Sequence, residues 1–400
     1  MAVAPGHPGV HVEEMPAGLK AITGVPTAIA LFAGWSARGV LDEAIHVRSF
    51  TEFEREFGGL DPRSLLGYSV KHFFDNGGSD AWVVRIAGAA TQAGNDGTVL
   101  TPADDDFHAA LLARFGVGSV TDRIDLFNLV CVPGLVHAPT LARLQAECRR
   151  RRAFLIIDAD PQATVASMAS SGTRGLAGED GTFSAIYFPW LRAVDPAQGG
   201  RVRDFPPCGF VAGVMARTDG SRGAWKAPAG SEASLAGALA LSVPISDPQN
   251  GQLNPLGVNC LRTLPERGTV VWGARTLHGQ DDRASEWKYI PVRRTALFIE
   301  ESLHRGTRWM VFEPNDERLW AQVRSNVGTF MHDLWRQGVL QGSRPREACF
   351  VKCDRETMTQ DDIDNGIVNI LVGFAPLKPT EFLVLRIQQH AAPPPAVIRP

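Results

Sequence analysis

The chain has 400 residues, of which 44% are hydrophobic and 21% charged, and its formal net charge is −3. This length exceeds one typical hydrophobic core, so we expect two domains with extensions. The composition excludes a largely disordered chain, and the balanced charge gives no basic footprint for a nucleic-acid partner. The longest apolar run near the start, residues 28–33, is too short to span a bilayer. Residues 1–20 have no apolar signal-peptide core, so we expect folding in the cytoplasm without membrane insertion.

The first 20 residues, here called the N-terminal arm, are interrupted by Pro and Gly but contain a short extended pattern. Val10 and Val12 alternate with His11 and Glu13, which is the period of a strand. No strand close by in the sequence can pair with this segment. Two interpretations stay open: a frayed tail, or an arm that adds a strand to another molecule's sheet.

An α/β body is predicted over residues 21–258, because apolar strands alternate with amphipathic helices. This alternation favours helices packed on a mainly parallel sheet. Strands are expected at 27–35, 81–86, 125–132, 153–157 and 184–189. Helices are expected at 49–59, 64–76, 104–115, 139–152, 163–170 and 207–219. Residues 193–207 are interpreted as a surface connection, and residues 221–258 as a Pro- and Gly-rich region.

A smaller α+β domain is predicted over residues 259–380. Its most regular element is a helix near 316–337, with an apolar stripe every three to four residues, Asn315 or Asp316 at its cap and Gly338 after its end. Strands are expected at 268–274, 309–312 and 348–352, and a second helix at 290–304.

Two further strands are expected between Asn369 and Gln389, separated by Pro376 and Pro379, which cannot donate ladder hydrogen bonds. Residues 381–400 form the last strand and a Pro-rich tail that cannot pack by itself. The last strand therefore has an exposed edge, which either closes a local hairpin or is used by a partner. In this strand the side chains alternate between Phe382, Val384 and Arg386 on one face and Leu383, Leu385 and Ile387 on the other.

Chemistry-bearing patterns are weak in this chain. Phosphate-binding, hydrolase and zinc-protease motifs are absent from the sequence, and six scattered cysteines are expected to be free thiols. Asp158 and Asp160 follow a predicted strand, where α/β enzymes place carboxylates, but turn formation is the favoured interpretation. Arg149–Arg152 favours a solvated helix end. We therefore expect no catalytic site, cofactor or metal.

Several stretches, taken in order, resemble the contractile tail sheath proteins of myophage tails and contractile injection systems. They include Pro8-Gly-Val-His-Val-Glu-Glu14, Gly268-Thr-Val-Val-Trp-Gly-Ala-Arg-Thr276, Trp287-Lys-Tyr-Ile-Pro-Val-Arg-Arg294 and Phe312-Glu-Pro-Asn-Asp316 with the closing strand pair. The ordered set carries the resemblance, and the last third of the chain is its most specific part. His11 stands where this family commonly has an aromatic residue. The middle of the chain is short, so we expect the variable outward-facing insertions of larger sheath proteins to be largely missing, which argues against a surface-decoration role.

The resemblance implies that the N-terminal arm and the C-terminal strand leave their own subunit and pair in a neighbour's C-terminal sheet. It assigns inter-subunit contacts to Pro8, Gly9, Val10, His11, Val12 and Glu13, and to Phe382, Leu383, Val384, Leu385, Arg386 and Ile387. The recipient sheet would include Ile370, Leu371, Val372 and Phe374. Arg318, Arg324 and Arg336 would face an inner tube.

On this resemblance the chain is a structural subunit that polymerises as hexameric rings around a tube and contracts to drive it through an envelope. Its partners would be other copies, the tube protein, and baseplate and terminator or collar proteins. Assembly would occur in the bacterial cytoplasm, and the final location would be a phage tail or released particle. The alternatives are another structural component of the same particle and an α/β enzyme of unknown chemistry.

Overall fold

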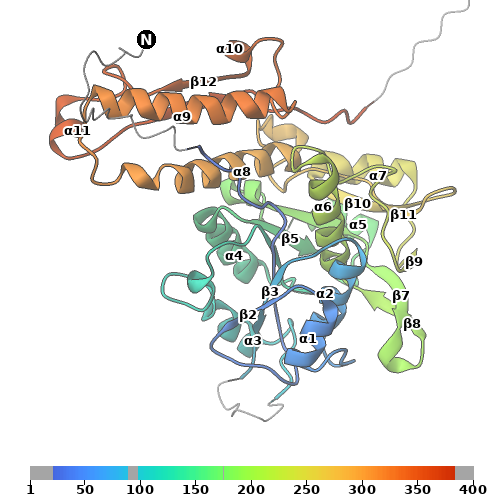
Figure 1. Ribbon diagram of the computed structural model, residues 1–400. Coiled ribbons are helices and arrows are strands. Elements are labelled where there is room, and N and C mark those ends of the chain that lie inside the picture. Colours follow the sequence, from blue (N-terminus) through green and yellow to red (C-terminus); the bar gives the residue numbers. More distant parts are fainter. Residues whose placement is uncertain (1–20, 89–97, 174, 383–400) are drawn as a thin grey trace, which may run out of the picture.

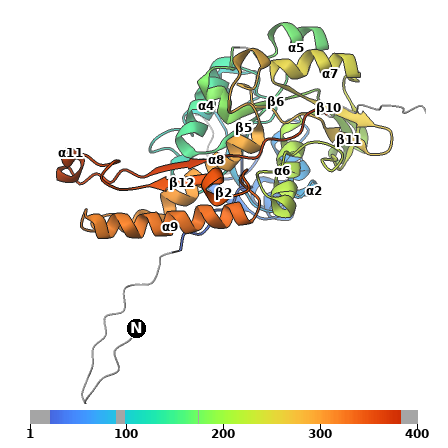
Figure 2. The ribbon, with the colours of Figure 1, turned by 90° about the horizontal axis from the view of Figure 1, so that it is seen from above.

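The computed structural model describes residues 21–88, 98–173 and 175–382. Figure 1 shows a larger body built around a twisted sheet, with a smaller layer of helices and strands across its top. In the view from above, the long helix α9 lies alongside strand β12, and α8 lies between them and the body (Figure 2). The predicted class, helices on a mainly parallel sheet with a smaller α+β part, is confirmed.

The body sheet has eight strands in the order β11-β10-β6-β5-β4-β1-β3-β2 within the described residues. Their bounds are β1 Ala30–Gly34, β2 Ala44–Val47, β3 Ala81–Arg85, β4 Leu129–Cys131, β5 Phe154–Asp158, β6 Ser184–Phe188, β10 Val258–Leu264 and β11 Gly268–Val271. Neighbours pair in parallel from β3 to β10, and only the two edge strands β2 and β11 run antiparallel. Every residue of β1, β5 and β6 is buried, as expected for parallel strands covered on both faces.

Helices cover both faces of this sheet. The body helices are α1 Phe50–Phe57, α2 Leu66–Asp75, α3 Asp105–Leu112, α4 Ala138–Arg151, α5 Val165–Ser171, α6 Cys208–Arg222 and α7 Asp247–Leu253. Figure 1 shows α2 and α6 on one side of the strands and α3 and α4 on the other. The chain order explains this arrangement, because the sheet grows from β1 first toward β3 and then, through β4, in the opposite direction.

A second, three-stranded antiparallel sheet lies beside the body sheet in the order β8-β7-β9. Its strands are β7 Leu191–Asp195, β8 Arg201–Phe205 and β9 Ala238–Leu241. The expectation of a surface connection over 193–207 is therefore wrong. Residues 193–207 contain a hairpin whose turn uses Gly199 and Gly200, both with positive φ. Glycine is suited to this backbone geometry because it has no Cβ atom.

The smaller part contains α8 Ile290–Gly306, α9 Glu317–Arg336, α10 Pro345–Ala348, α11 Gln360–Asp364 and the antiparallel strands β12 Cys349–Lys352 and β13 Leu371–Phe374. The long predicted helix is confirmed as α9, and the Asp316 side chain caps it by accepting from the Leu319 amide at 2.9 Å. The strand expected at 309–312 is wrong: α8 is followed by a short 3₁₀ turn, Arg308–Met310. Four apolar residues are too few to distinguish a strand from a turn by pattern.

Two hydrophobic clusters divide the molecule within helix α8. The larger cluster contains the body sheet and includes Ile290 and Leu297, whereas the smaller one begins with Ile299 and contains the buried side of α9. The domain boundary expected between residues 258 and 259 would cut β10, a strand of the body sheet, directly after its first residue. We therefore propose that the division of the two parts lies in α8.

All six cysteines are free thiols, as expected. Over residues 21–88, 98–173 and 175–382, no group of three His, Cys, Asp or Glu side chains has a metal-binding arrangement. Within the same ranges no helix has the length and apolar content needed to cross a membrane.

Candidate functional site

The segment that follows the N-terminal arm, residues 21–29, lies along helix α8. Ile22 contacts Gly306, where an added Cβ would lie 2.6 Å from the Ile22 side chain. The Val25 amide donates to the Ser302 hydroxyl at 3.1 Å. Only a glycine at position 306 permits this close approach, so the end of α8 holds the chain at the point where the arm begins. We call residues 21–29 the N-terminal base.

A buried ion pair fixes the inner end of the N-terminal base. Arg294 on α8 donates to both carboxylate oxygens of Asp219 on α6, at 3.0 and 2.6 Å, and the two side chains are 4% and 3% exposed. Thr27 completes the contact, because its hydroxyl donates to Asp219 at 2.6 Å and its carbonyl accepts from Arg294 at 2.8 Å. Two parallel charge-assisted bonds give this pair a defined geometry. The pair thus joins the body, α8 and the N-terminal base.

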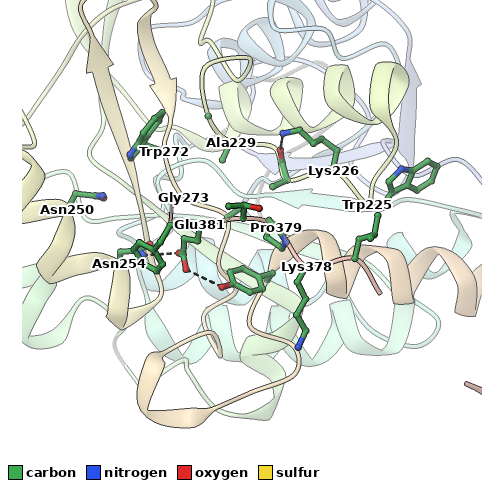
Figure 3. Close-up of a pocket in the computed structure, with 17 residues that line it drawn as sticks. Trp225, Lys226, Ala229, Asn250, Asn254, Trp272, Gly273, Lys378, Pro379 and Glu381 are labelled. Atoms are coloured by element: carbon green, nitrogen blue, oxygen red, sulfur yellow. Dashed lines mark hydrogen bonds between the residues drawn. The ribbon is translucent and has the colours of Figure 1, made fainter. Parts of the chain in front are cut away.

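At the other end of α8 a second charged cluster holds residues 377–382, which we call the C-terminal base. The Arg275 side chain is fully buried, and its Nε and Nη2 donate to the two oxygens of Glu381, both at 2.7 Å. Asn254 donates to the same carboxylate at 2.8 Å and the Tyr289 hydroxyl lies 3.2 Å from it. Figure 3 shows Glu381 between Asn254 and Pro379, with a dashed line to Asn254.

The charge state of Glu381 follows from two opposing effects. Burial by itself would raise its pKa, but the hydrogen bonds from Arg275 and Asn254 outweigh burial and hold the pKa below its ordinary value. Burial, followed by the nearby Glu381 carboxylate, raises the pKa of Tyr289. The Glu381 carboxylate is therefore ionised at neutral pH, and its negative charge compensates the positive charge of the buried Arg275 guanidinium.

The two bases lie at opposite ends of one helix. Tyr289, which contacts Glu381, is the residue directly before α8, and Gly306, which contacts Ile22, is the last residue of α8. Consistent with this, the described chain starts and ends at well-separated places along the upper layer in Figure 1. Helix α8 therefore supports both points at which the terminal segments leave the described structure.

The predicted recipient strand is present, but with only one partner. β13 pairs with β12 in the register Cys349–Phe374 to Lys352–Leu371, and no third strand pairs with this sheet within the described ranges. Val372 and Phe374 pack against the α9 cluster, Ile370 precedes the strand, and Leu371 is 52% exposed on the opposite face. Pro376 is expected to mark the end of pairing, but it forms an isolated antiparallel bridge with Leu340 two residues after β13, so pairing does not stop there.

The other predicted strand-exchange residues lie outside the described ranges. This holds for Pro8 to Glu13 of the N-terminal arm and for Leu383 to Ile387 of the last strand. Phe382 is the last described residue and its side chain is 72% exposed. The two-stranded sheet thus has unpaired edges on both sides among the described residues, with apolar side chains on its uncovered face.

The three arginines expected to face a tube do not share one environment. Arg318 and Arg336 are exposed on α9, and Arg336 lies 4.0 Å from Asp333. Arg324 is half-buried and donates to the Cys353 carbonyl, so it lies on the side of α9 that faces the end of β12. Arg324 is therefore removed from the exposed side, and the other two stay predictions.

Asp158, the carboxylate that could have indicated an enzyme, holds two backbone segments together. Asp158 is buried and accepts hydrogen bonds from the amides of Gly134 at 2.9 Å and Cys208 at 2.7 Å. Burial raises its pKa to about 6, although these two amides act in the opposite direction. Asp158 therefore joins the start of α6 to the loop after β4. Asp160 accepts from the amide of Gln162 at 2.8 Å, in agreement with the turn interpretation.

The basic cluster at the end of α4 is less solvated than expected. Arg151 donates to the carbonyls of Thr121, Asp122 and Ile124, and Arg152 pairs with Glu301 of α8 at 3.0 Å. Arg149 pairs with Asp180 at 2.9 Å and Arg150 with Asp122 at 2.8 Å. The interpretation of Arg149–Arg152 as a solvated helix end is therefore wrong, because all four side chains contact neighbouring segments.

Sequence reasoning missed the residues that hold the bases. Arg275 and Glu381 are 106 residues apart, and Asp219 and Arg294 are 75 apart, so no local pattern pairs them. One signal was available: Arg275 directly follows the apolar stretch Val270–Ala274, and an arginine there requires an acidic partner if it is buried.

Comparison with known families identifies the chain. The phage tail sheath protein central domain matches residues 124–277, and the phage tail sheath C-terminal domain matches residues 282–390. The chain belongs to the phage tail sheath family. The tail sheath protein of Vibrio phage KVP40 is 21% identical in an alignment of 358 positions that covers 79% of this chain and 50% of that protein. This sheath-family chain spans about half the length of the curated relatives it matches.

Solved sheath structures resemble the chain over nearly its full length. The sheath of the extracellular contractile injection system PVC, in the contracted state, superimposes with a TM-score of 0.78 at 28% identity, covering 97% of this chain and 99% of that one. A chain of the anti-feeding prophage baseplate gives a TM-score of 0.75 at 27% identity, covering 97% and 100%. The similarity includes both parts of the molecule.

Proposed function

We propose that the chain is the structural subunit of a contractile sheath, which polymerises helically as hexameric rings around an inner tube and contracts to drive the tube through a target envelope. The observation that carries this proposal is the two-stranded sheet β12–β13, whose edges have no strand partner among residues 21–88, 98–173 and 175–382. The two terminal segments are in addition held at opposite ends of α8. A two-stranded sheet is marginally stable by itself and gains stability from added strands. A role in structure rather than catalysis agrees with the family.

Strand exchange supplies those added strands. The N-terminal arm and the last strand of one subunit pair with β12 and β13 of its neighbours, through Val10, Val12 and Leu383 to Ile387. Backbone ladders persist when subunit bodies reorient, because the pairing depends on main-chain groups and not on the body surfaces. The energy for contraction then comes from better packing between bodies, and no nucleotide is needed.

The proposed partners follow from the same arrangement. Other copies of the chain pair through the arms, and the exposed side of α9 with Arg318 and Arg336 faces the inner tube. Baseplate and terminator or collar proteins bind at the two ends of the polymer, and the baseplate relative supports the first of these. Assembly takes place in the bacterial cytoplasm, and the product is a phage tail or a released injection particle.

Negative-stain electron microscopy of the purified protein over a range of concentrations tests this proposal. We expect hollow cylinders from the full chain, and none from variants lacking residues 1–20 or 383–400. The second deletion keeps Glu381 and its partners, so the subunit should retain its circular-dichroism spectrum and unfolding midpoint. A shorter deletion of residues 391–400, which keeps the last strand, is the matched control and should still form cylinders. Cylinders from the arm-deleted variants would contradict strand exchange.

A further inference from the structure

A groove with aromatic walls lies beside the C-terminal base. It has a volume of about 700 Å³ and is lined by Trp225, Trp272, Tyr289, Leu377 and Phe382, which we call the aromatic groove. Figure 3 shows Trp272 on one side and Trp225 on the other, with Pro379 and Glu381 between them. Trp272 is 39% exposed, so this groove leaves apolar surface in contact with water.

Three charged side chains line the aromatic groove: two of them, Glu381 and Lys226, have partners, and the third, Lys378, is exposed to solvent. Glu381 is held by Arg275 and Asn254, and the Lys226 ammonium donates to the Ala227 carbonyl at 3.1 Å. A charged occupant would therefore find little compensation for the water it loses. The groove suits an uncharged, apolar segment whose backbone does not need ladder hydrogen bonds.

The chain itself contains such a segment. Residues 391–398 read Ala-Ala-Pro-Pro-Pro-Ala-Val-Ile, with three successive prolines and no charged side chain. Consecutive prolines favour the polyproline II helix, which has no internal hydrogen bonds and loses little entropy on binding. Grooves with aromatic walls are a recurrent binding site for polyproline II segments.

We propose that the aromatic groove binds residues 391–398 of a neighbouring subunit. This inference rests on the proposed strand exchange, which carries residues 383–388 onto the neighbour's sheet. The groove begins at Leu377, three residues after the end of β13. Three extended residues span about 10 Å, which is the greatest distance from the end of β13 to Leu377. The five residues from 388 to 393 reach about 17 Å, which is enough to pass from a strand beside β13 into the groove.

The exchanged C-terminal segment of a neighbouring subunit is then attached in two ways. Its strand forms a backbone ladder with the two-stranded sheet, and its prolines make apolar contacts in the aromatic groove. The ladder is insensitive to sequence, whereas the groove selects prolines. The arm of the correct partner is thereby held in one register, because slipping along the ladder would move the prolines away from Trp272.

A peptide of residues 389–400 tests the groove directly. The acceptor is the full-length chain with Pro393, Pro394 and Pro395 replaced by Ser, kept dilute so that it stays unassembled. We expect the peptide to shift the tryptophan emission of this acceptor saturably. Trp272→Ala in the acceptor, or a peptide with the three prolines replaced by Ser, should weaken binding at least about tenfold. Equal binding of both peptides, or no binding, would overturn the proposal.

Two further measurements test which subunit supplies the bound segment and, independently, whether strand exchange occurs. If the dilute wild-type chain already shows the emission of the peptide-bound acceptor, the segment fills its own groove and the assignment to a neighbour is overturned. Cylinders formed by the arm-deleted variants would contradict strand exchange itself. Trp272→Ala should still form cylinders, which dissociate at a lower urea concentration than wild-type cylinders.

Discussion

Two of the three sheets in the described part of the chain, the body sheet and the β12–β13 sheet, have opposite roles. The body sheet is covered by helices on both faces and its central strands are fully buried, so it is complete within one subunit. The β12–β13 sheet has a single covered face and unpaired edges among the described residues, with Phe350 and Leu371 each about half exposed. A sheet that is complete favours a stable subunit, and one that is incomplete favours association.

The largest effect is expected at the junction of the two parts. Asp219→Ala leaves the buried charge of Arg294 without its partner, which should lower the free energy of unfolding by about 3–5 kcal/mol. The double variant Asp219→Ala with Arg294→Met removes both charges and should recover more than half of this loss. Urea unfolding of the unassembled subunit measures both. Equal stability of the single and double variants would show that the pair is not coupled.

A matched pair of apolar truncations separates the two sheets. Ile156→Ala in β5, where the side chain is 1% exposed, should cost roughly 2–5 kcal/mol of subunit stability because it opens a cavity. Leu371→Ala in β13 should cost under about 1 kcal/mol, since half of that side chain already contacts water. The order reverses in assembly, where Leu371→Ala should raise the concentration needed for cylinders. Sedimentation at a series of concentrations measures this, and an unchanged threshold would contradict a recipient role for β13.

The body sheet should also show a pH signature that the small sheet lacks. Burial raises the pKa of Asp158 to about 6, above its unfolded value. Its contribution to stability is therefore fully present below about pH 4 and is lost as pH rises through about 6. Between pH 4 and 7 the wild type should lose up to about 3 kcal/mol relative to Asp158→Asn. Urea unfolding at the two pH values measures the difference, and parallel pH profiles of the two proteins would refute it.

The smallest effect of removing a charged group is expected at the C-terminal base. Glu381→Gln removes the charge that Arg275 faces and should cost about 1–3 kcal/mol at neutral pH. Because the pKa of Glu381 is lowered, its contribution is present above about pH 4.5 and disappears as pH falls through the lowered pKa. Glu313→Gln, at an exposed position, is the control. If both variants unfold alike at pH 7, the base is not held by this ion pair.

Sequence patterns predicted the elements whose signal is local. Helix α9 was expected over 316–337 and spans Glu317–Arg336, because its apolar stripe, its cap at Asp316 and Gly338 agree. The sequence does not predict strand β8, Arg201–Phe205, because the two glycines before it, Gly199 and Gly200, are typical of a loop as well as of a hairpin turn. Strand exchange itself is inferred from the resemblance, since unpaired ends are equally consistent with frayed tails.

The candidate site was predicted less completely than the fold. The strand β13 is predicted correctly, whereas Arg324 was predicted to face the tube and instead donates to the Cys353 carbonyl. Residue spacing defines the faces of a helix, but it does not show where a long side chain ends. The pairs Arg275–Glu381 and Asp219–Arg294 depend on contacts across the fold. Such contacts appear only once the elements are packed.

The position of the two bases at opposite ends of α8 has a mechanical consequence. The helix has 17 residues, so it separates the bases by about 25 Å along its axis. If neighbours pull on both terminal segments, the tension passes lengthwise through α8, whose hydrogen bonds lie parallel to the pull. It enters the body through the ion pairs that α8 makes with it, Arg294–Asp219, Glu301–Arg152 and Arg305–Asp125. The body would then rotate as a rigid unit under this tension, and the strands of its sheet would not be stretched.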